Sequence, residues 1–191
     1  MAIPDRDPSI MAESDNDEEL IESARQGDDL AFERLMRRHS NSIRNLIASF
    51  FRNRSMVDDL AQETFVKAYF GLSSFRNESP FLYWLKQIAA HLCLDEVRNR
   101  RTHGMEQQDG IESIANSSEH DPKDRLEARL TLDKMLASLK PVDRMIVVLL
   151  YGEGYNVAEI AGLTGLSRAN VKVRAFRIRH RLRTLYAGGV V

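Results

Sequence analysis

The apolar residues between positions 57 and 72 recur every three or four positions, which restricts this segment to an amphipathic α-helix. Neither strand alternation nor a hairpin signal occurs elsewhere in the 191 residues, and no repeat of solenoid length is visible. We therefore predict an all-α fold. The positions on the apolar stripe are Val57, Leu60, Ala61, Thr64, Phe65, Ala68, Tyr69 and Leu72.

Similar periodicity predicts helices on both sides of this segment. One starts at Asp17, breaks at residues 27–29 and is followed by a second over residues 31–50, which we expect to lie nearly in line with the first. Another covers residues 81–101; its first half is apolar nearly all round, and its second half is basic. A chain of this length, with 43% hydrophobic residues, is long enough for one ordinary core or two small ones.

A polar stretch without apolar periodicity divides the chain. We predict two small helical domains joined by a flexible linker. The expected parts are a disordered acidic tail over residues 1–16, a first domain over residues 17–101, the linker over residues 102–122 and a second domain over residues 123–191.

Charge is segregated although the net charge is only −1. Residues 1–19 hold seven acids and one arginine, whereas residues 168–191 hold seven lysines or arginines and no acid, so the basic end is the one expected to face phosphates. The single cysteine excludes an internal disulfide, no apolar run is long enough to span a bilayer, and the acidic start lacks the features of a signal peptide. We expect a cytoplasmic protein without membrane insertion.

A helix-turn-helix pattern occupies residues 157–185. Val157 and Ile160 give a short first helix its apolar face, Gly165 supplies a turn, and Ser167 is a suitable N-cap for a second helix that begins at Arg168. The apolar stripe of that second helix leaves its cations outside, where they face solvent or DNA. Its first residues would meet base edges and its later ones phosphates. The base-edge candidates are Arg168, Asn170, Lys172 and Arg174, and the phosphate candidates are Arg177, Arg179 and Arg181. The alternative is an amphipathic surface helix that arginines keep soluble.

These segments resemble a known family. Residues 59–69 (DLAQETFVKAY), 74–76 (SFR) and 81–89 (FLYWLKQIA) are similar to conserved region 2 of bacterial sigma factors of the extracytoplasmic function (ECF) group. Residues 139–144 (LKPVDR), 153–155 (EGY), 159–161 (EIA), 165–167 (GLS) and 171–172 (VK) resemble region 4 of the same group. The resemblance covers about residues 18–185, in the right order.

The resemblance implies a subunit that binds core RNA polymerase, directs it to promoter DNA and helps to open the duplex. It implies no catalytic residue, metal, cofactor or small-molecule substrate, so we do not expect an enzyme. In the family, the helix that matches residues 58–69 docks on the clamp coiled coil of the largest polymerase subunit. Asp59, Gln62 and Glu63 are therefore expected polymerase contacts, although an ordinary solvated acidic edge is the alternative.

The resemblance also implies two promoter contacts. The loop at residues 73–80 and the helix after it correspond to the part that reads the minus-10 element, and residues 168–179 correspond to the helix that reads the minus-35 element. The aromatic candidates for base capture have an alternative role in the core. The expected minus-10 contacts are Phe75, Arg76, Asn77, Tyr83, Trp84, Arg98, Asn99, Arg100 and Arg101, and the expected minus-35 contacts are Ser167, Arg168, Asn170, Lys172, Arg174, Arg177 and Arg179.

Two further expectations come from the family. Its members are commonly held inactive by an anti-sigma factor, so we expect such a partner here. The family linker threads into the polymerase channels; a plain flexible tether is an equal alternative for this chain. Residues 168–170 read Arg-Ala-Asn where many members have a small residue or threonine, so the promoter sequence cannot be transferred.

Two rival functions remain weaker. A two-domain regulator that binds operators without polymerase would need a sensory or dimerising first domain, and neither a phosphoacceptor pattern nor coiled-coil heptads occur there. An enzyme would have its best starting point in His91, Cys93 and Asp95, but their alternate spacing points them around a helix rather than toward one metal. Cys93 is most simply a small core residue.

Overall fold

The computed structural model describes residues 14–51, 53–102 and 134–187. Every regular element in these ranges is helical, which confirms the all-α prediction. The predicted linker at residues 102–122 lies, apart from Thr102, outside the described residues, as does most of the predicted tail. The elements of the first half are α2 (Ser14–Arg25), α3 (Asp29–Ala48), α4 (Arg54–Gly71), the 3-10 turn η1 (Leu72–Ser74) and α5 (Phe81–Thr102). Those of the second half are α7 (Pro141–Val147), the π-helical turn η2 (Val148–Gly152), α8 (Val157–Thr164) and α9 (Arg168–Ala187).

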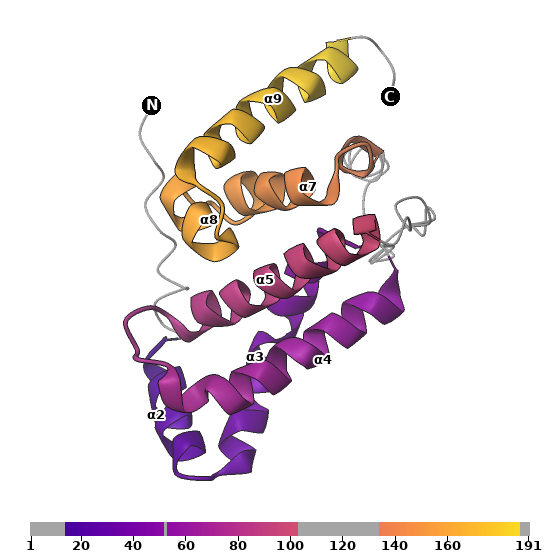
Figure 1. Ribbon diagram of the computed structural model, residues 1–191. Coiled ribbons are helices and arrows are strands. Elements are labelled where there is room, and N and C mark those ends of the chain that lie inside the picture. Colours follow the sequence, from indigo (N-terminus) through magenta and orange to yellow (C-terminus); the bar gives the residue numbers. More distant parts are fainter. Residues whose placement is uncertain (1–13, 52, 103–133, 188–191) are drawn as a thin grey trace, which may run out of the picture.

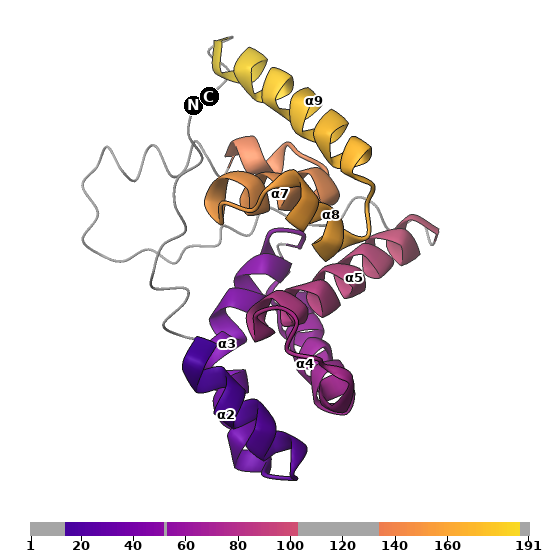
Figure 2. The ribbon, with the colours of Figure 1, turned by 90° about the vertical axis from the view of Figure 1, so that its left-hand side faces the viewer.

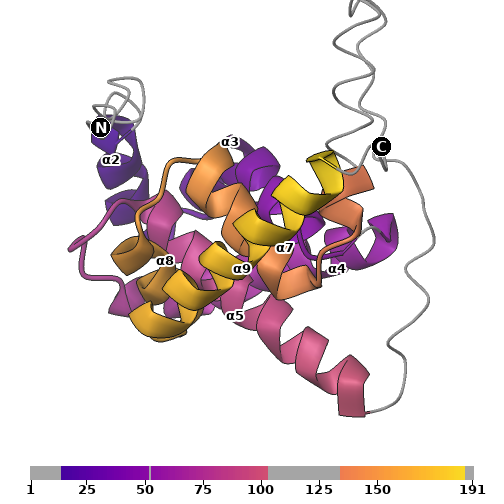
Figure 3. The same cartoon turned by 90° about the horizontal axis from the view of Figure 1, so that it is seen from above.

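The elements form two tiers that meet at α5. Helices α2, α3 and α4 lie on one side of α5, and α7, α8 and α9 lie on the other (Figures 1 and 2). Seen from above, α9 crosses the molecule over α5, with α7 beside it (Figure 3). The buried apolar side chains of both halves belong to one continuous cluster. Helix α5 is thus buried on two faces, which explains why its first half is apolar nearly all round.

Helices α2 and α3 fold back on each other, so the prediction that they lie nearly in line was wrong. Gly27, at φ +95°, and the N-cap Asp28 reverse the chain between them. Near the start of α2, Asp17 is buried and pairs with His39 in the middle of α3 at 2.8 Å. Arg38 contacts the other carboxylate oxygen at 2.5 Å. A buried carboxylate needs such partners, and they fix the antiparallel pairing.

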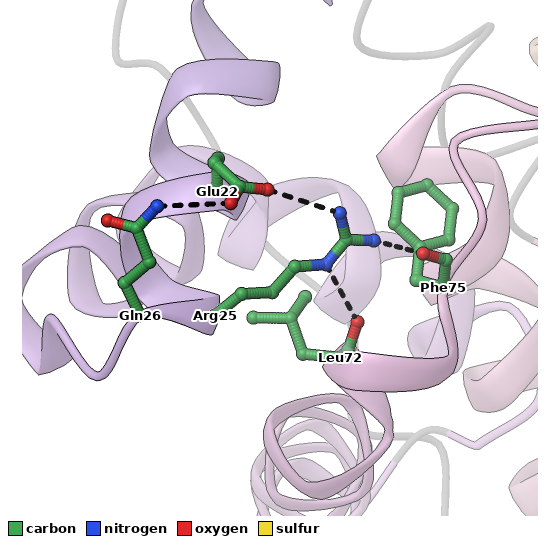
Figure 4. A network of polar contacts seen from close by, with 5 residues as sticks. All are labelled: Glu22, Arg25, Gln26, Leu72 and Phe75. Carbon is green, nitrogen blue, oxygen red and sulfur yellow. Dashed lines mark hydrogen bonds and ion pairs between the residues drawn. The ribbon is translucent and has the colours of Figure 1, made fainter.

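Arg25, the last residue of α2, ties this helix to the segment that leads into α5 (Figure 4). Its Nε donates to the Leu72 carbonyl at 3.3 Å and its Nη2 donates to the Phe75 carbonyl. Glu22, one turn earlier on α2, contacts the same guanidinium at 3.6 Å. The guanidinium therefore holds two backbone acceptors that follow α4 and positions the loop at residues 75–80.

No helix in the described residues is both long and apolar enough to cross a lipid bilayer.

We predict that Arg25→Lys destabilises the protein by about 1–3 kcal/mol, because an ammonium keeps the charge but cannot reach two carbonyls as a planar fork. Urea unfolding followed by circular dichroism measures this change. Arg34→Lys, at an exposed position on α3, is the matched control and should leave the midpoint unchanged. Equal midpoints for the two variants would contradict the structural role of Arg25.

Cys93 is fully buried on α5. Burial is the larger cause that raises the pKa of its thiol, and the negative charge of the nearby Glu96 carboxylate adds to it. Because the thiolate is the reactive form, a thiol reagent should label Cys93 only when the chain opens, with a rate that rises as urea is added. Ser73→Cys, which places a thiol at an exposed position, should be labelled at once in the native protein. Labelling of Cys93 at that same native rate would show that the thiol is accessible.

Candidate functional site

Helix α4 exposes a polar stripe on the side away from the core. Asp59, Gln62 and Glu63 are all exposed and lie three and four positions apart, on one face. The opposite face is buried from Val57 to Ala68, so the apolar stripe predicted from the sequence packs, except for Tyr69, which is 44% exposed. Glu63 makes only a surface ion pair with Lys67, at 3.3 Å, which leaves its carboxylate able to exchange partners.

An exposed apolar patch extends this polar stripe. Val66 and Phe70 continue the same face of α4, with 47% and 78% of their surface exposed. On α3, Leu30 is 66% exposed and directly follows Asp29, the hydrogen-bond partner of Tyr69 on α4. Tyr69 borders the patch and donates a hydrogen bond to Asp29 at 2.8 Å, which raises the pKa of its phenol. Large exposed apolar side chains that gather in one place indicate a protein-binding surface. The sequence analysis missed Leu30, Val66 and Phe70, and the signal that could have found them was apolar residues outside the buried stripe.

The aromatic candidates of the loop belong largely to the core. Phe75 is 6% exposed and packs against Trp84 and Phe81, at ring-centroid distances of 4.9 Å and 5.6 Å. Its ring is therefore not available to stack on a base. Trp84 is half-buried in the same aromatic group, and thus the core alternative describes both residues.

Arg76 and Asn77 lie on the outside of this loop. Both are exposed, and Asn77 has a left-handed backbone at φ 55°, which asparagine tolerates better than most residues. The Arg76 guanidinium is 3.9 Å from the Glu78 carboxylate. Beside the loop is a cavity of about 310 Å³. Its lining residues are Asp17, Glu18, Ile21, His39, Phe75, Asn77, Glu78, Ser79, Pro80, Phe81 and Leu82.

The cations at the end of α5 differ from one another. Arg98 is exposed and pairs with Asp95 at 2.7 Å. Arg100 is partly buried, pairs with Glu96 and lies over the Phe51 ring, 5.4 Å from its centroid. Asn99 is exposed, whereas the side chain of Arg101 lies outside the described residues. Arg98 is thus more available for a phosphate than Arg100, which helps to pack α5 on the first half.

Helix α8 covers the face of α5 that carries Tyr83, Lys86 and Gln87. The Tyr83 hydroxyl donates to the Glu159 carbonyl at 3.1 Å, and Gln87 Nε2 donates to the Gly162 carbonyl at 3.2 Å. Lys86 is only 5% exposed; it pairs with Glu153 and lies 5.1 Å from the centroid of the Tyr155 ring. Burial raises the pKa of Tyr83 and of Tyr155, with Lys86 acting in the opposite direction on Tyr155.

Two glycines allow α8 to approach α5 this closely. A Cβ added at Gly162 would be 2.7 Å from the Tyr83 hydroxyl oxygen, and one at Gly165 would be 3.3 Å from His91 Nε2. Gly165 also adopts a left-handed conformation, at φ 68°, as the C-cap of α8. The turn at Gly165 follows from the sequence, whereas the close approach of both glycines to another helix is a property of the tertiary structure.

The helix-turn-helix forms with the N-cap expected at Ser167. The Ser167 hydroxyl accepts from the Asn170 backbone N–H at 3.2 Å, as an N-cap does. Helix α8 begins with a capping box between Asn156 and Glu159, which the sequence analysis did not identify. Val171, Ala175 and Ile178 of α9 are buried, and its predicted cations face outward. The exposed residues between positions 168 and 179 of α9 are Arg168, Ala169, Asn170, Lys172, Val173, Phe176, Arg177 and Arg179.

Arg174 is the exception among the predicted base readers. It is partly buried and bonded to Asn170 and to Asp143 of α7. Two apolar residues that were not predicted share the outer surface of α9: Val173 is 46% exposed and Phe176 is 68% exposed. Exposed apolar side chains on a helix in the major groove can contact thymine methyl groups. Their position off the buried stripe was the available sequence signal.

His91, Cys93 and Asp95, the candidate residues for an enzyme, do not come together in the structure. Cys93 is buried, whereas His91 and Asp95 are exposed on the other side of α5. In the parts of the chain that the structure describes, no three His, Cys, Asp or Glu side chains are placed to hold a metal ion.

Comparison with known proteins gives two family matches. Residues 35–103 match the model of sigma-70 region 2, and residues 129–182 match that of sigma-70 region 4. The chain is 33% identical to the RNA polymerase sigma factor NccH of Alcaligenes xylosoxydans xylosoxydans, over 94% of this chain and 96% of that protein. It is 29% identical to the ECF RNA polymerase sigma factor SigM of Mycobacterium tuberculosis, over 89% of this chain and 84% of that protein.

Two solved structures have a similar fold. CnrH in complex with the cytosolic domain of CnrY matches with a TM-score of 0.62 and 29% identity, over 91% of this chain and 99% of that one. The sigma factor RpoE of Bartonella quintana, in complex with the anti-sigma factor NepR, matches with a TM-score of 0.63 and 22% identity, over 82% of this chain and 96% of that one. With both regions matched in order and relatives aligned over nearly their full length, the chain belongs to the sigma-70 family of RNA polymerase sigma factors, in its ECF group.

Proposed function

We propose that three separate surfaces of this chain carry its work as a sigma factor: α4 binds core polymerase, the loop before α5 captures the minus-10 element, and α9 reads the minus-35 element. The observation that carries the proposal is a division of charge. The exposed stripe of α4 carries acidic and apolar side chains, whereas the exposed face of α9 carries lysines and arginines beside a few apolar residues, and no acid occurs in α9. Surfaces of opposite character on opposite tiers suit two different partners.

The polymerase surface combines Asp59, Gln62 and Glu63 with the apolar patch of Leu30, Val66 and Phe70. Carboxylates and an amide can pair with a basic helix of the clamp, and the apolar patch can supply the buried centre of the interface. The buried face of α4 holds the helix rigid behind these side chains. The expected contact set from the sequence is therefore retained and enlarged.

The minus-10 surface centres on the cavity beside the loop rather than on the loop aromatics. Asn77 lines this cavity, and Arg76 lies exposed next to it. At about 310 Å³ the cavity is at the lower end of the range for ligand pockets. An extruded base needs polar partners and a cation for its phosphate, which these residues offer. Phe75 and Trp84 support the loop from behind, and Arg98 follows along α5.

The minus-35 surface is the outer face of α9. Arg168, Asn170 and Lys172 lie in its first turn and a half, the part of a recognition helix that reaches base edges. Arg177 and Arg179 are exposed further along the helix, where contacts to phosphates are expected. Ser167, as the N-cap, fixes where the helix begins.

Use of Tyr83 at the minus-10 element requires α8 to leave α5. Tyr83, one of the expected minus-10 contacts, is bonded to α8, and the neighbouring Lys86 is buried under Glu153 and Tyr155. We infer that the arrangement in the structure is a closed form and that promoter binding separates the tiers. An anti-sigma factor would hold the chain inactive; the complexes of CnrH with CnrY and of RpoE with NepR support such a partner here.

The chain acts as an initiation factor in the cytoplasm, where polymerase and promoter are found. The chemistry of RNA synthesis belongs to the core enzyme, and the chain supplies recognition.

Mutations on α4 and mutations on α9 should impair different activities. Gln62→Ala with Glu63→Ala should reduce capture of core polymerase roughly three- to tenfold, because charged interface partners are lost. Arg168→Ala or Lys172→Ala should weaken duplex binding by about 1–3 kcal/mol and leave polymerase capture intact. Pull-down with bacterial core polymerase and gel-shift with promoter duplex measure the two effects, and run-off transcription reports both.

Each surface offers a matched control. Glu33 forms the same kind of i,i+4 surface pair with Arg37 that Glu63 forms with Lys67, so Glu33→Ala should leave polymerase capture unchanged. Arg183→Ala, at the far end of α9, should leave base recognition unchanged. Specific duplex binding with no polymerase capture by the unmodified chain would instead favour an operator-binding regulator.

A bulky residue at Gly162 should open the molecule. In Gly162→Leu the Cβ would be 2.7 Å from the Tyr83 hydroxyl oxygen, so either Tyr83 gives up its bond to the Glu159 carbonyl or α8 moves away, and both weaken the contact of α8 with α5. Small-angle X-ray scattering should show a larger radius of gyration, and binding of single-stranded minus-10 DNA should rise. Gly152→Leu is the control, since a Cβ there is in ordinary contact with Val148 at 3.9 Å. An unchanged radius for Gly162→Leu would argue against a closed form that depends on this contact.

A further inference from the structure

A chain of hydrogen bonds connects α7 to the base-reading part of α9. Asp143, in the first turn of α7, accepts from Arg174 Nη1 at 2.5 Å. Arg174 Nε in turn donates to the Asn170 side-chain oxygen at 2.8 Å. Asn170 is one turn before Arg174, and its backbone N–H is bonded to the Ser167 cap. The network therefore runs from outside the helix-turn-helix to the start of the recognition helix.

The network is partly shielded from water. The side chains of Arg174 and Asp143 are 34% and 22% exposed, whereas Asn170 is exposed. Val171 and Ala175, which flank these positions on α9, are buried and hold the helix backbone against α7 and α8. A charge-assisted bond with this degree of burial is stronger than an ordinary surface pair. The polar end of the network, Asn170, is the part that reaches solvent.

The bonds of Arg174 conflict with a direct base-reading role. An arginine reads guanine through two neighbouring N–H groups that point the same way. A fork from the Nε edge would have to give up the bond to Asn170, and a fork that includes Nη1 would compete with the carboxylate of Asp143. If Arg174 kept its bond to Asp143 while it contacted a base, the Asp143 carboxylate would lie close to the DNA. The negative charges of the carboxylate and of the phosphates would then repel each other. Arg174 is thus better placed as a support than as a reader.

The same bonds fix the amide of Asn170. Its oxygen faces Arg174, so its NH₂ group points away from the network. An asparagine distinguishes bases only if its donor and acceptor keep one orientation, because a flipped amide exchanges the two. Without the arginine, the exposed Asn170 side chain would turn freely.

We propose that Asp143 is a specificity-determining positioning residue for minus-35 recognition: through Arg174 it holds the Asn170 amide in the orientation that reads one base pair. The proposal rests on α9 being the minus-35 reader, as proposed above. It names a residue of α7 that need not touch DNA and that lies outside the helix-turn-helix pattern in the sequence.

A purely electrostatic role for Asp143 makes a different prediction. Removing a negative charge close to DNA should tighten binding to every duplex alike and leave base preference unchanged. A positioning role predicts a loss of preference at one base pair, whatever happens to the average affinity. Base preference therefore separates the two roles, whereas a single affinity does not.

The test is selection of promoter duplexes from a pool randomised across the upstream element, with the full chain bound to core polymerase. For Asp143→Asn we expect the preference at one base pair to fall by about three- to tenfold, with the other positions unchanged. Asn170→Ala should lose preference at the same base pair. A selected motif for Asp143→Asn that matches the original at every position would overturn the proposal.

Further variants separate positioning from folding. Arg174→Lys keeps a cation but cannot bridge Asp143 and Asn170, so it should reproduce the loss at that base pair. Asp143→Glu, which keeps the carboxylate, should restore most of the preference. In the double variant of Asp143→Asn and Asn170→Ala, the loss at that base pair should be no greater than in Asn170→Ala alone; additive losses would overturn the proposal.

Thermal unfolding of each variant checks that α9 is intact. If Asp143→Asn unfolds, Arg174→Lys decides the question by the same criterion. Failure of the proposed function gives a different result, since the unmodified chain would then enrich no upstream motif.

Discussion

The burial of α5 on two faces is the constraint on which the rest of the structure depends. Its side chains Leu85, Ala89 and Cys93 are fully buried in the first half, and its Tyr83, Lys86 and Gln87 contact the second half. One helix therefore belongs to both tiers. Because apolar burial stabilises by roughly 25 cal/mol per Å², the two buried faces of α5 hold the elements packed on them in place. The position of the loop that precedes α5 depends on this packing.

The core contains charged and polar side chains, and each of those described is paired with another polar group. Asp17 pairs with His39 of another helix, and Lys86 pairs with Glu153 of the segment between η2 and α8. Among the described residues no buried side-chain nitrogen or oxygen lacks a partner. Such pairs add little net stability, but a wrong arrangement of the helices would leave a buried charge alone. They select one packing, and the pair between Lys86 and Glu153 does so across the two tiers. Since Lys86 and Glu153 become hydrated when the tiers separate, the contact between the two tiers can open more easily than an apolar interface of equal area.

Local patterns predicted the helices well and their relationships poorly. The stripe of α4, the start of α5 at Phe81 and the cap at Ser167 follow from residues within one or two turns, so sequence spacing was sufficient. The fold-back of α2 on α3 depends on the contact of Asp17 with His39, which lie 22 positions apart. Phe75 could equally have been a base-stacking residue or a core residue until its contacts with Phe81 and Trp84 were known. Arg174 had the spacing of a base reader, yet its partner Asp143 lies on another helix, 31 positions away.

The sequence by itself determined the helical class, the family and the division into an acidic surface and a basic one. These properties depend on residue type and on local periodicity, which a single chain carries without reference to its fold. The tertiary structure alone decided which candidates are free to bind: Glu63 and Arg168 face solvent, whereas Tyr83 is covered by α8. Exposure is a property of what packs against a residue, and its neighbours come from distant parts of the chain.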